Sequence, residues 1–251
     1  MDQVVFETVY RGRQSVWHHM SYMRLAKVWL ALELLRQSGM NLAEKKIFDY
    51  GFGAGTLFHY LPKTANLFGV EQDPKVCEEV AAKIKKKWGG RVDLAPIEIE
   101  RWTEHRLLKQ KYDLIVCSHV LEHLPEPEGL LKVLGECLSP TGRIVGLVPI
   151  HERAENPHHV QKASKGVILS WAKSSGLEVE KYLEGDPWLY WLQPIYTHDA
   201  GAWHMVSQGI SLGSGFLALL LGPRMWARLG RIFGALTGSL PTQAAFILKK
   251  R

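Results

Sequence analysis

The hydrophobic residues follow two patterns that alternate between residues 44 and 185. Short, nearly continuous apolar runs predict strands, and apolar residues spaced three or four apart predict helices. Strands are expected at residues 46–51, 67–73, 91–99, 112–120, 143–149, 177–184 and 244–250. Helices are expected at residues 57–62, 75–88, 128–138 and 161–175. This alternation predicts an α/β fold with a doubly wound, seven-stranded, mostly parallel sheet.

Two regions lie outside the alternation. Residues 17–38 predict a helix, and its apolar face would comprise Met20, Met23, Val28, Leu32 and Leu35. Residues 186–242 begin with an aromatic cluster of Trp188, Tyr190, Trp191, Tyr196 and Trp203. We therefore expect an N-terminal helical cap (1–43), a core (44–185 with 243–251) and a lid insertion (186–242).

The second half of the insertion predicts an amphipathic helix over residues 223–236. Its apolar face would comprise Met225, Leu229, Ile232, Phe233 and Leu236, and its polar face Arg224, Arg228 and Arg231. One interpretation is an ordinary helix packed on its own domain. The other is an interfacial helix, so that residues 216–236 would provide a peripheral membrane contact. The longest purely apolar run, residues 216–221, is too short to cross a bilayer.

Composition narrows the class of protein only slightly. The chain has 251 residues, 46% hydrophobic and 22% charged, as is ordinary for a globular protein, and a formal charge of +6. Its basic residues are dispersed apart from Lys83, Lys85, Lys86 and Lys87, so no nucleic-acid partner is expected. Cys77, Cys117 and Cys137 form no CxxC pair, and the N-terminus has no apolar signal core. We expect a reducing, cytoplasmic compartment.

The stretch IFDYGFGAGT (47–56) places three glycines directly after the first predicted strand. Glycines there let the backbone turn and approach a ligand closely. Glu71 follows Gly51 by twenty residues, at the end of the second strand, where a carboxylate can bind ribose hydroxyls. The spacing is GxGxG instead of the dinucleotide GxGxxG, and Asp49 suits a cationic ligand better than a pyrophosphate. The pattern favours S-adenosylmethionine.

In these motifs the chain resembles the class I S-adenosylmethionine-dependent methyltransferases, and the resemblance implies a Rossmann-like methyltransferase fold. DYGFGAG (49–55) matches the first motif of that family, and YDLIVCSHVLEHLPEP (112–127) resembles the fourth-strand signature of its small-molecule and ubiquinone-biosynthesis-like branch. CLSPTGRIVGLVP (137–149) resembles the turn and fifth strand. The cofactor-binding residues that the resemblance implies are Asp49, Gly51, Gly53, Gly55, Glu71, Gln72, Glu98, Ser118 and His119. Glu98 matches its position less well, because the usual Gly-Asp-Ala is absent.

Histidines supply the candidate bases. Transfer to a hydroxyl requires loss of its proton, and imidazole is the usual acceptor near neutral pH. His119 follows the fourth strand and His151 follows the fifth, so both are expected at the cofactor cleft. His158 and His159 lie in the next loop, and His18 and His19 begin the N-terminal helix.

The letters HVLEH (119–123) also spell an inverted zinc-peptidase motif, but they follow a buried strand instead of lying within a helix. Glu122-His123 resembles a metal-binding pair in methyltransferases that modify small-RNA 3′ ends, which His151 or His158 could complete. The alternative is that His123 packs and hydrogen-bonds at a helix start. Our prediction is that the site holds no metal.

The sequence thus predicts methyl transfer from S-adenosylmethionine to a small or lipid-like acceptor with an apolar portion, by direct in-line displacement. The aromatic residues of the insertion would bind that apolar portion. One alternative is an RNA 3′-end methyltransferase with a Glu/His metal site. The other is an interaction protein that binds the cofactor without transferring the methyl group.

Overall fold

The computed structural model describes residues 19, 21–152, 158–188, 190 and 202–251. Their strands form one seven-stranded sheet in the order β3-β2-β1-β4-β5-β7-β6, in which only β7 runs antiparallel to its neighbours. The strands are β1 (Lys46–Tyr50), β2 (Asn66–Glu71), β3 (Val92–Pro96), β4 (Tyr112–Ser118), β5 (Leu138–Pro149), β6 (Leu177–Gly185) and β7 (Gln243–Lys250). The predicted doubly wound, mostly parallel sheet is confirmed.

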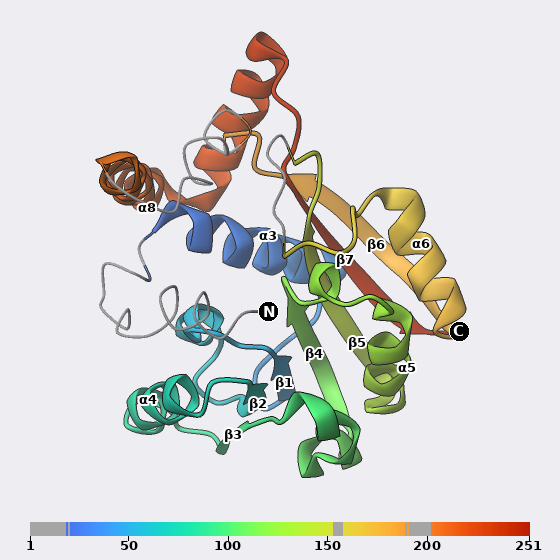
Figure 1. The fold of residues 1–251 in the computed structure, drawn as a ribbon. Coiled ribbons are helices and arrows are strands. Elements are labelled where there is room, and N and C mark those ends of the chain that lie inside the picture. The colour runs from blue at the N-terminus through green and yellow to red at the C-terminus, as the bar shows by residue number, and fades with distance from the viewer. Residues whose placement is uncertain (1–18, 20, 153–157, 189, 191–201) are drawn as a thin grey trace.

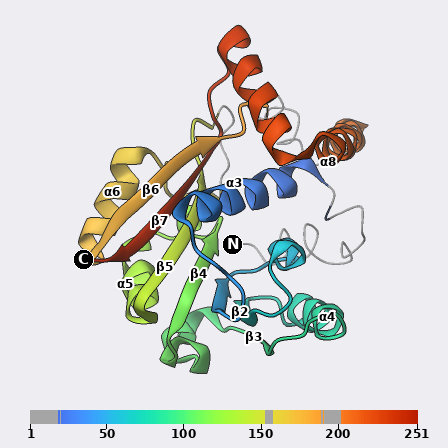
Figure 2. The same cartoon turned by 180° about the vertical axis from the view of Figure 1, so that it is seen from behind.

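Helices cover both faces of the sheet (Figures 1 and 2). The α-helices are α3 (Tyr22–Ser38), α4 (Pro74–Lys85), α5 (Pro127–Glu136), α6 (Lys165–Ser174) and α8 (Ala202–Thr237). Short 3₁₀ helices are η1 (Thr56–Tyr60), η2 (Ile99–Glu104), η3 (Arg106–Lys109) and η4 (Leu121–His123). Residues of α3 and α4 share one hydrophobic cluster with one face of the sheet, and residues of α5 and α6 share a second cluster with the other face.

Burial on both faces explains the sequence pattern of the central strands. Leu114 and Val116 of β4 point into the cluster beneath α3, whereas Ile115 and Cys117 point into the cluster beneath α5. A strand buried on both sides has no polar face, which is why it appears as a continuous apolar run. β1, β2 and β4 are parallel neighbours, so their carboxyl ends meet at one edge of the sheet.

Several element boundaries differ from those predicted. The third strand lies within residues 91–99 as expected, at Val92–Pro96, whereas the helix predicted at residues 161–175 begins only at Lys165. β5 already begins at Leu138, although residues 139–142 contain proline and glycine and were expected to form a turn. A register shift opposite Tyr112 and Leu114 accommodates this segment in the sheet. Gly142 lies so close to Tyr112 that a Cβ would be 2.6 Å from its carbonyl oxygen.

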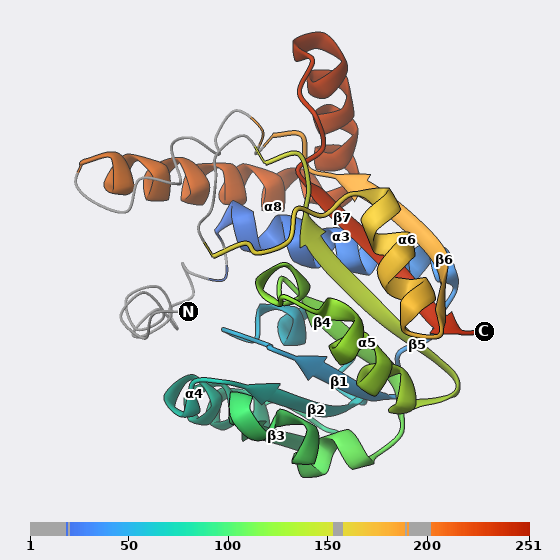
Figure 3. The same ribbon diagram turned by 45° about the vertical axis from the view of Figure 1, so that its right-hand side comes forward.

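α8 lies between β6 and β7 in sequence and beside α3 in space (Figure 3). It consists of two helical segments joined at a kink, because Gly222 has the non-helical angles φ 75° and ψ 160° and Pro223 follows it. In the first half, the small residues Ser211 and Ala218 face α3, where the Ser211 and Ser21 hydroxyls are 2.8 Å apart. In the second half, Phe233 stacks on Trp188 at 4.4 Å.

Candidate active site

The glycine loop after β1 has the backbone that its sequence predicts. Gly51, Gly53 and Gly55 all have positive φ, between 51° and 73°. A Cβ on Gly51 would lie 2.8 Å from the side chain of Val120, which follows β4. The loop therefore presents bare backbone at the edge where β1, β2 and β4 end.

Glu71 holds this loop to the end of β2. Its Oε2 accepts a hydrogen bond from the Gly53 N–H at 2.6 Å, and its Oε1 accepts one from the Gln72 N–H at 2.8 Å. The carboxylate is buried. Burial raises the pKa of Glu71, and the backbone donors, including Gly53 and Gln72, oppose that effect.

Asp49 lies on β1 beneath the loop and is also buried. Burial, together with the charge of Glu71, raises the pKa of Asp49 to about 8. No hydrogen-bond partner reaches its Oδ1 among the residues that the structure describes. A buried carboxyl oxygen without a partner is costly unless a ligand pairs with it. Asp49 therefore fits the ammonium or sulfonium group of the expected cofactor.

The remaining cofactor-binding candidates surround this edge. Gln72 is exposed directly after β2, and Ser118 is half-buried at the end of β4. Glu98 is exposed before η2, and Ile97, its neighbour, donates a main-chain hydrogen bond of 3.0 Å to the carbonyl of Glu71. Gln72, Ser118 and Glu98 thus all lie at or just after the carboxyl ends of parallel strands of the sheet, β2, β4 and β3.

His119 is the candidate base with the more organised surroundings. Its φ is 57°, and its main-chain N–H donates to the carbonyl of Leu147 on β5. Its Nδ1 lies 2.9 Å from Oε1 of Glu122, a wholly buried carboxylate. A carboxylate at one ring nitrogen orients an imidazole so that the other nitrogen can accept a proton. Burial and the nearby Lys27 lower the pKa of His119, which keeps the ring neutral.

Lys27 was missed by the sequence analysis. It projects from α3, and burial lowers its pKa to about 8, against the attraction of the Glu122 and Asp186 charges. The available signal was its position in RLAKVWLALELL (24–35), where it is the single charge in an apolar helical stretch between Arg24 and Glu33. It supplies a positive charge beside His119 and Glu122.

The other histidines are placed differently. His151, the second candidate base, has an exposed side chain, and its Nδ1 lies 2.8 Å from the carbonyl oxygen of Pro241. His19 lies over the glycine loop, where its Nδ1 is 3.1 Å from the Thr56 hydroxyl. His158 and His159 lie beside η4, and His18 falls outside the described residues.

The aromatic cluster of the insertion is described only in part. Trp188 stacks against Trp226 at 5.1 Å as well as on Phe233. The Tyr190 N–H donates to the carbonyl of Pro187 at 3.2 Å. Trp191 and Tyr196 lie outside the described residues, as does the side chain of Trp203.

α8 exposes most of the apolar side chains that the sequence placed on one face. Met225, Leu229, Ile232 and Leu236 are exposed, and Leu236 reaches 81% exposure. The packed face instead comprises Trp226, Gly230 and Phe233, against Trp188. Phe216, Leu217, Leu219, Leu220 and Leu221 are exposed as well. Residues 209–237 are long and apolar enough to cross a membrane by length and composition, although they bend at Gly222.

A family model described as a methyltransferase domain matches residues 16–194 of the chain. A curated relative, the ubiquinone biosynthesis O-methyltransferase of Histophilus somni (strain 2336), is 31% identical over 114 residues, which are 44% of this chain and 48% of that protein. The chain spans about half the length of the curated relatives it matches.

Solved structures with the same fold have different activities. Coclaurine N-methyltransferase bound to N-methylheliamine and SAH has a TM-score of 0.58 at 15% identity, covering 90% of this chain and 74% of that chain. The [4+2]-cyclase SpnF has a TM-score of 0.57 at 13% identity, covering 89% of this chain and 80% of that chain. These similarities show the fold alone, and the cyclase demonstrates that this fold does not by itself determine the reaction.

Proposed function

Because the chain belongs to the class I S-adenosylmethionine-dependent methyltransferases, as the match over residues 16–194 shows, we propose that it methylates a hydroxyl oxygen of a small, lipid-like acceptor. S-adenosylmethionine is the methyl donor of this family. The choice of a hydroxyl oxygen as the acceptor atom rests on the His119–Glu122 pair, in which Nδ1 lies 2.9 Å from Oε1. The name of the curated relatives, ubiquinone biosynthesis O-methyltransferase, supports the same choice.

On the donor side, the glycine loop and the two buried carboxyl groups bind different parts of the cofactor. Glu71 binds the ribose hydroxyls with the lone pairs that its backbone donors leave available. Asp49 pairs with the positive charge of the methionine part. The sulfonium supplies a methyl group whose bond to sulfur breaks as its bond to the acceptor oxygen forms.

On the acceptor side, the chain removes one proton. His119 accepts the hydroxyl proton on Nε2, while Glu122 holds the opposite nitrogen and stabilises the imidazolium that forms. Lys27 places a positive charge near the oxygen as negative charge develops there. The acceptor becomes a methyl ether and the cofactor becomes neutral S-adenosylhomocysteine, so charge and atoms balance.

The apolar portion of the acceptor is bound, in this proposal, by the insertion together with the N-terminal helix. The contacts between α3 and α8 support this role, because they place both elements at the same end of the molecule. His19 adds a contact from the N-terminal side to the glycine loop. Trp188 joins the start of the insertion to α8, where it stacks on Trp226 and Phe233.

The exposed apolar residues of α8 contact a membrane surface in the same proposal. No Asp or Glu follows Asp199, whereas Arg224, Arg228 and Arg231 are exposed on the helix. Exposed apolar side chains flanked by cations fit an anionic lipid interface. The packing of α8 on α3 favours a helix that lies along the interface beside its domain over one that crosses the bilayer. This position gives access to a lipid-like acceptor.

The test uses S-adenosylmethionine with a deuterated methyl group, a lipid extract and, in parallel, a small-RNA pool. Mass spectrometry should find a labelled methyl ether in the lipid extract. His119→Asn should lower the transfer rate at saturating cofactor by about 10²–10⁴-fold, the usual contribution of a general base. His151→Asn should leave the rate unchanged. Label in the RNA pool alone, or cofactor binding without transfer, would refute the proposal.

A further inference from the structure

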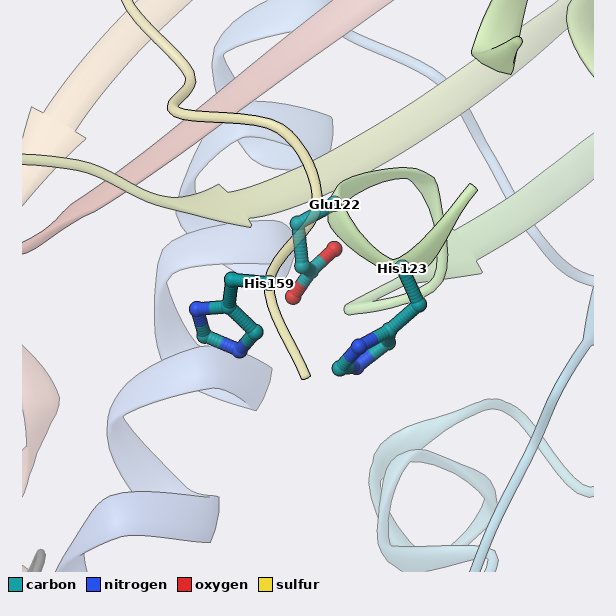
Figure 4. A group of neighbouring side chains, drawn as sticks. All are labelled: Glu122, His123 and His159. Carbon is teal, nitrogen blue, oxygen red and sulfur yellow. The ribbon is translucent and has the colours of Figure 1, made fainter. Parts of the chain in front are cut away.

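Glu122, His123 and His159 point toward one another (Figure 4), and His119 contacts Glu122. Their potential ligand atoms all lie within 4.8 Å of one another. Glu122 is 0% exposed, and within the described part of the chain no hydrogen bond reaches its Oε2. A carboxylate buried in this way is normally paired, hydrogen-bonded or bound to a metal ion.

The two histidines are oriented as metal ligands usually are. Nδ1 of His123 lies 2.8 Å from the carbonyl oxygen of His158, which can only accept a hydrogen bond. The proton of the neutral ring is therefore on Nδ1, and the lone pair is on Nε2. Nδ1 of His159 lies 2.7 Å from Oε1 of Glu152, which places a carboxylate beside the corresponding ring nitrogen. A carbonyl or carboxylate at the second ring nitrogen is the typical support of a ligating histidine.

The fold assembles this cluster from two segments that follow neighbouring parallel strands. Glu122 and His123 lie on η4, after β4, and His159 follows β5. The main chain of Gln161 donates to the carbonyl of Glu122 at 3.0 Å, and its side chain donates to the carbonyl of Pro125 at 2.9 Å. These bonds fasten the loop after β5 onto η4.

We propose that Glu122, His123 and His159 bind a divalent transition-metal cation, with Zn²⁺ as the best match. Two imidazoles and one carboxylate suit Zn²⁺ better than Mg²⁺ or Ca²⁺, which prefer oxygen ligands. Tetrahedral ligands about 2.1 Å from one ion are about 3.4 Å apart, so ligand atoms that lie within 4.8 Å of one another close by up to about 1.4 Å on binding. Three protein ligands also leave a coordination position for an outside oxygen atom.

This site differs from the one that the sequence offered. The sequence analysis considered His151 or His158 as the completing ligand and predicted no metal. His151 is exposed and bonded to Pro241, and His158 contributes its carbonyl oxygen to His123. His159 supplies the third side chain, 36 residues after His123 in sequence and with its ring centroid 5.0 Å away.

The test measures metal binding directly, on the whole chain without acceptor or cofactor, so its outcome is independent of the proposed transfer reaction. After stripping with a chelator, the protein is titrated with Zn²⁺ by calorimetry and its metal content is measured after dialysis. We expect one equivalent of bound Zn²⁺. Stripped protein loaded with Co²⁺ should show the visible absorption of a low-coordinate nitrogen and oxygen site.

The variants separate ligands from bystanders. His123→Ala and His159→Ala should each weaken Zn²⁺ binding at least about 100-fold, and both side chains are only partly buried, so the variants should fold. Glu152→Gln should weaken it about 10–100-fold, as expected for a group that orients a ligand. His151→Ala is the matched control and should bind as the wild type does. Failure of the wild type to retain Zn²⁺, or equal binding by a His123→Ala/His159→Ala double variant, would overturn the proposal.

Discussion

The main-chain N–H of Gly53 donates a 2.6 Å hydrogen bond to Oε2 of Glu71, which joins the glycine loop to the end of β2. Glu71 thus fixes the loop with one carboxylate oxygen, and in the proposed function the same carboxylate also binds the ribose.

Glu71→Ala should weaken S-adenosylmethionine binding by about 1.5–3 kcal/mol, the range for hydrogen bonds to a charged group. Isothermal calorimetry on the folded variant measures the change. Glu98→Ala is the comparison, because Glu98 is exposed and less well matched to the family, and it should cost less. A larger loss from Glu98→Ala than from Glu71→Ala would reverse this ranking of the two carboxylates.

Asp49 should make cofactor binding depend on pH. Its pKa of about 8 means that it is mainly protonated at pH 7 in the ligand-free protein, with Glu71 as the charged group that faces it. A cationic ligand favours the carboxylate and lowers that pKa, so binding releases a proton. Affinity should therefore rise between pH 6 and 7.5, by up to about tenfold per pH unit.

Calorimetry in two buffers of different ionisation enthalpy measures the released proton. Asp49→Asn should bind weakly, with no proton release from this position. The same shift affects folding: a carboxyl whose pKa is raised in the folded state favours folding at low pH, and this contribution is lost as pH rises from about 4 towards 8. Wild-type binding that is flat with pH would show that Asp49 is already ionised.

Replacement of Gly53 by alanine should leave the chain folded but weaken its binding of the cofactor. Alanine at its φ of 51° costs about 1–2 kcal/mol of stability and places a methyl group on the face of the loop. Gly176→Ala is a matched control, because Gly176 has φ 72° and open space around it after α6. Both variants should lose similar stability in thermal unfolding. Only Gly53→Ala should lose at least tenfold in cofactor affinity.

The parts of the site that sequence could predict are those set by local chain geometry. Gly51 and Gly53 follow a strand directly, and Glu71 ends the next one, so their spacing in sequence already implies their meeting at one edge. β4 was identifiable because burial on both faces makes its sequence almost continuously apolar. Predicted strand boundaries were wrong where pairing with a neighbouring strand outweighed the local preference of the residues. β5 is an example, since it begins at Leu138 and continues through a proline and a glycine.

The parts that could not be predicted depend on which loops come together. Nothing near His159 in sequence distinguishes it from His158, and the hydrogen bonds of Gln161 that join this loop to η4 link residues far apart in sequence. Lys27 has an ordinary position on a helix until α3 packs across β5, β6 and β7, where the Lys27 charge interacts with that of Glu122. The packed face of α8 was also unpredictable. A helical wheel places Phe233 and Met225 on one face, but in the structure Phe233 stacks on Trp188 and Met225 is exposed.

The exposed side of α8 yields the last prediction, that the protein binds anionic membranes through this helix. Each arginine near a charged lipid surface contributes about 1 kcal/mol, so changing Arg224, Arg228 and Arg231 to Glu should reduce binding to phosphatidylglycerol vesicles at least about 100-fold. Sedimentation with vesicles measures this loss. Changing Lys83, Lys85 and Lys86 to Glu is the matched control, because both triple variants shift the formal charge from +6 to 0. These lysines belong to α4 and its C-cap, so this variant should still bind.

Charge alone does not define an interfacial helix, so the apolar side chains need their own variant. Leu220 and Leu236 are 67% and 81% exposed, on opposite sides of the bend at Gly222. Changing both to Asp removes apolar area without disturbing the packed face, and it should release the protein from vesicles while thermal stability stays within about 0.5 kcal/mol per substitution, as for surface sites. If the wild type does not sediment with vesicles and instead self-associates through the exposed face of α8, the membrane role is wrong and α8 is an interface between copies of the chain.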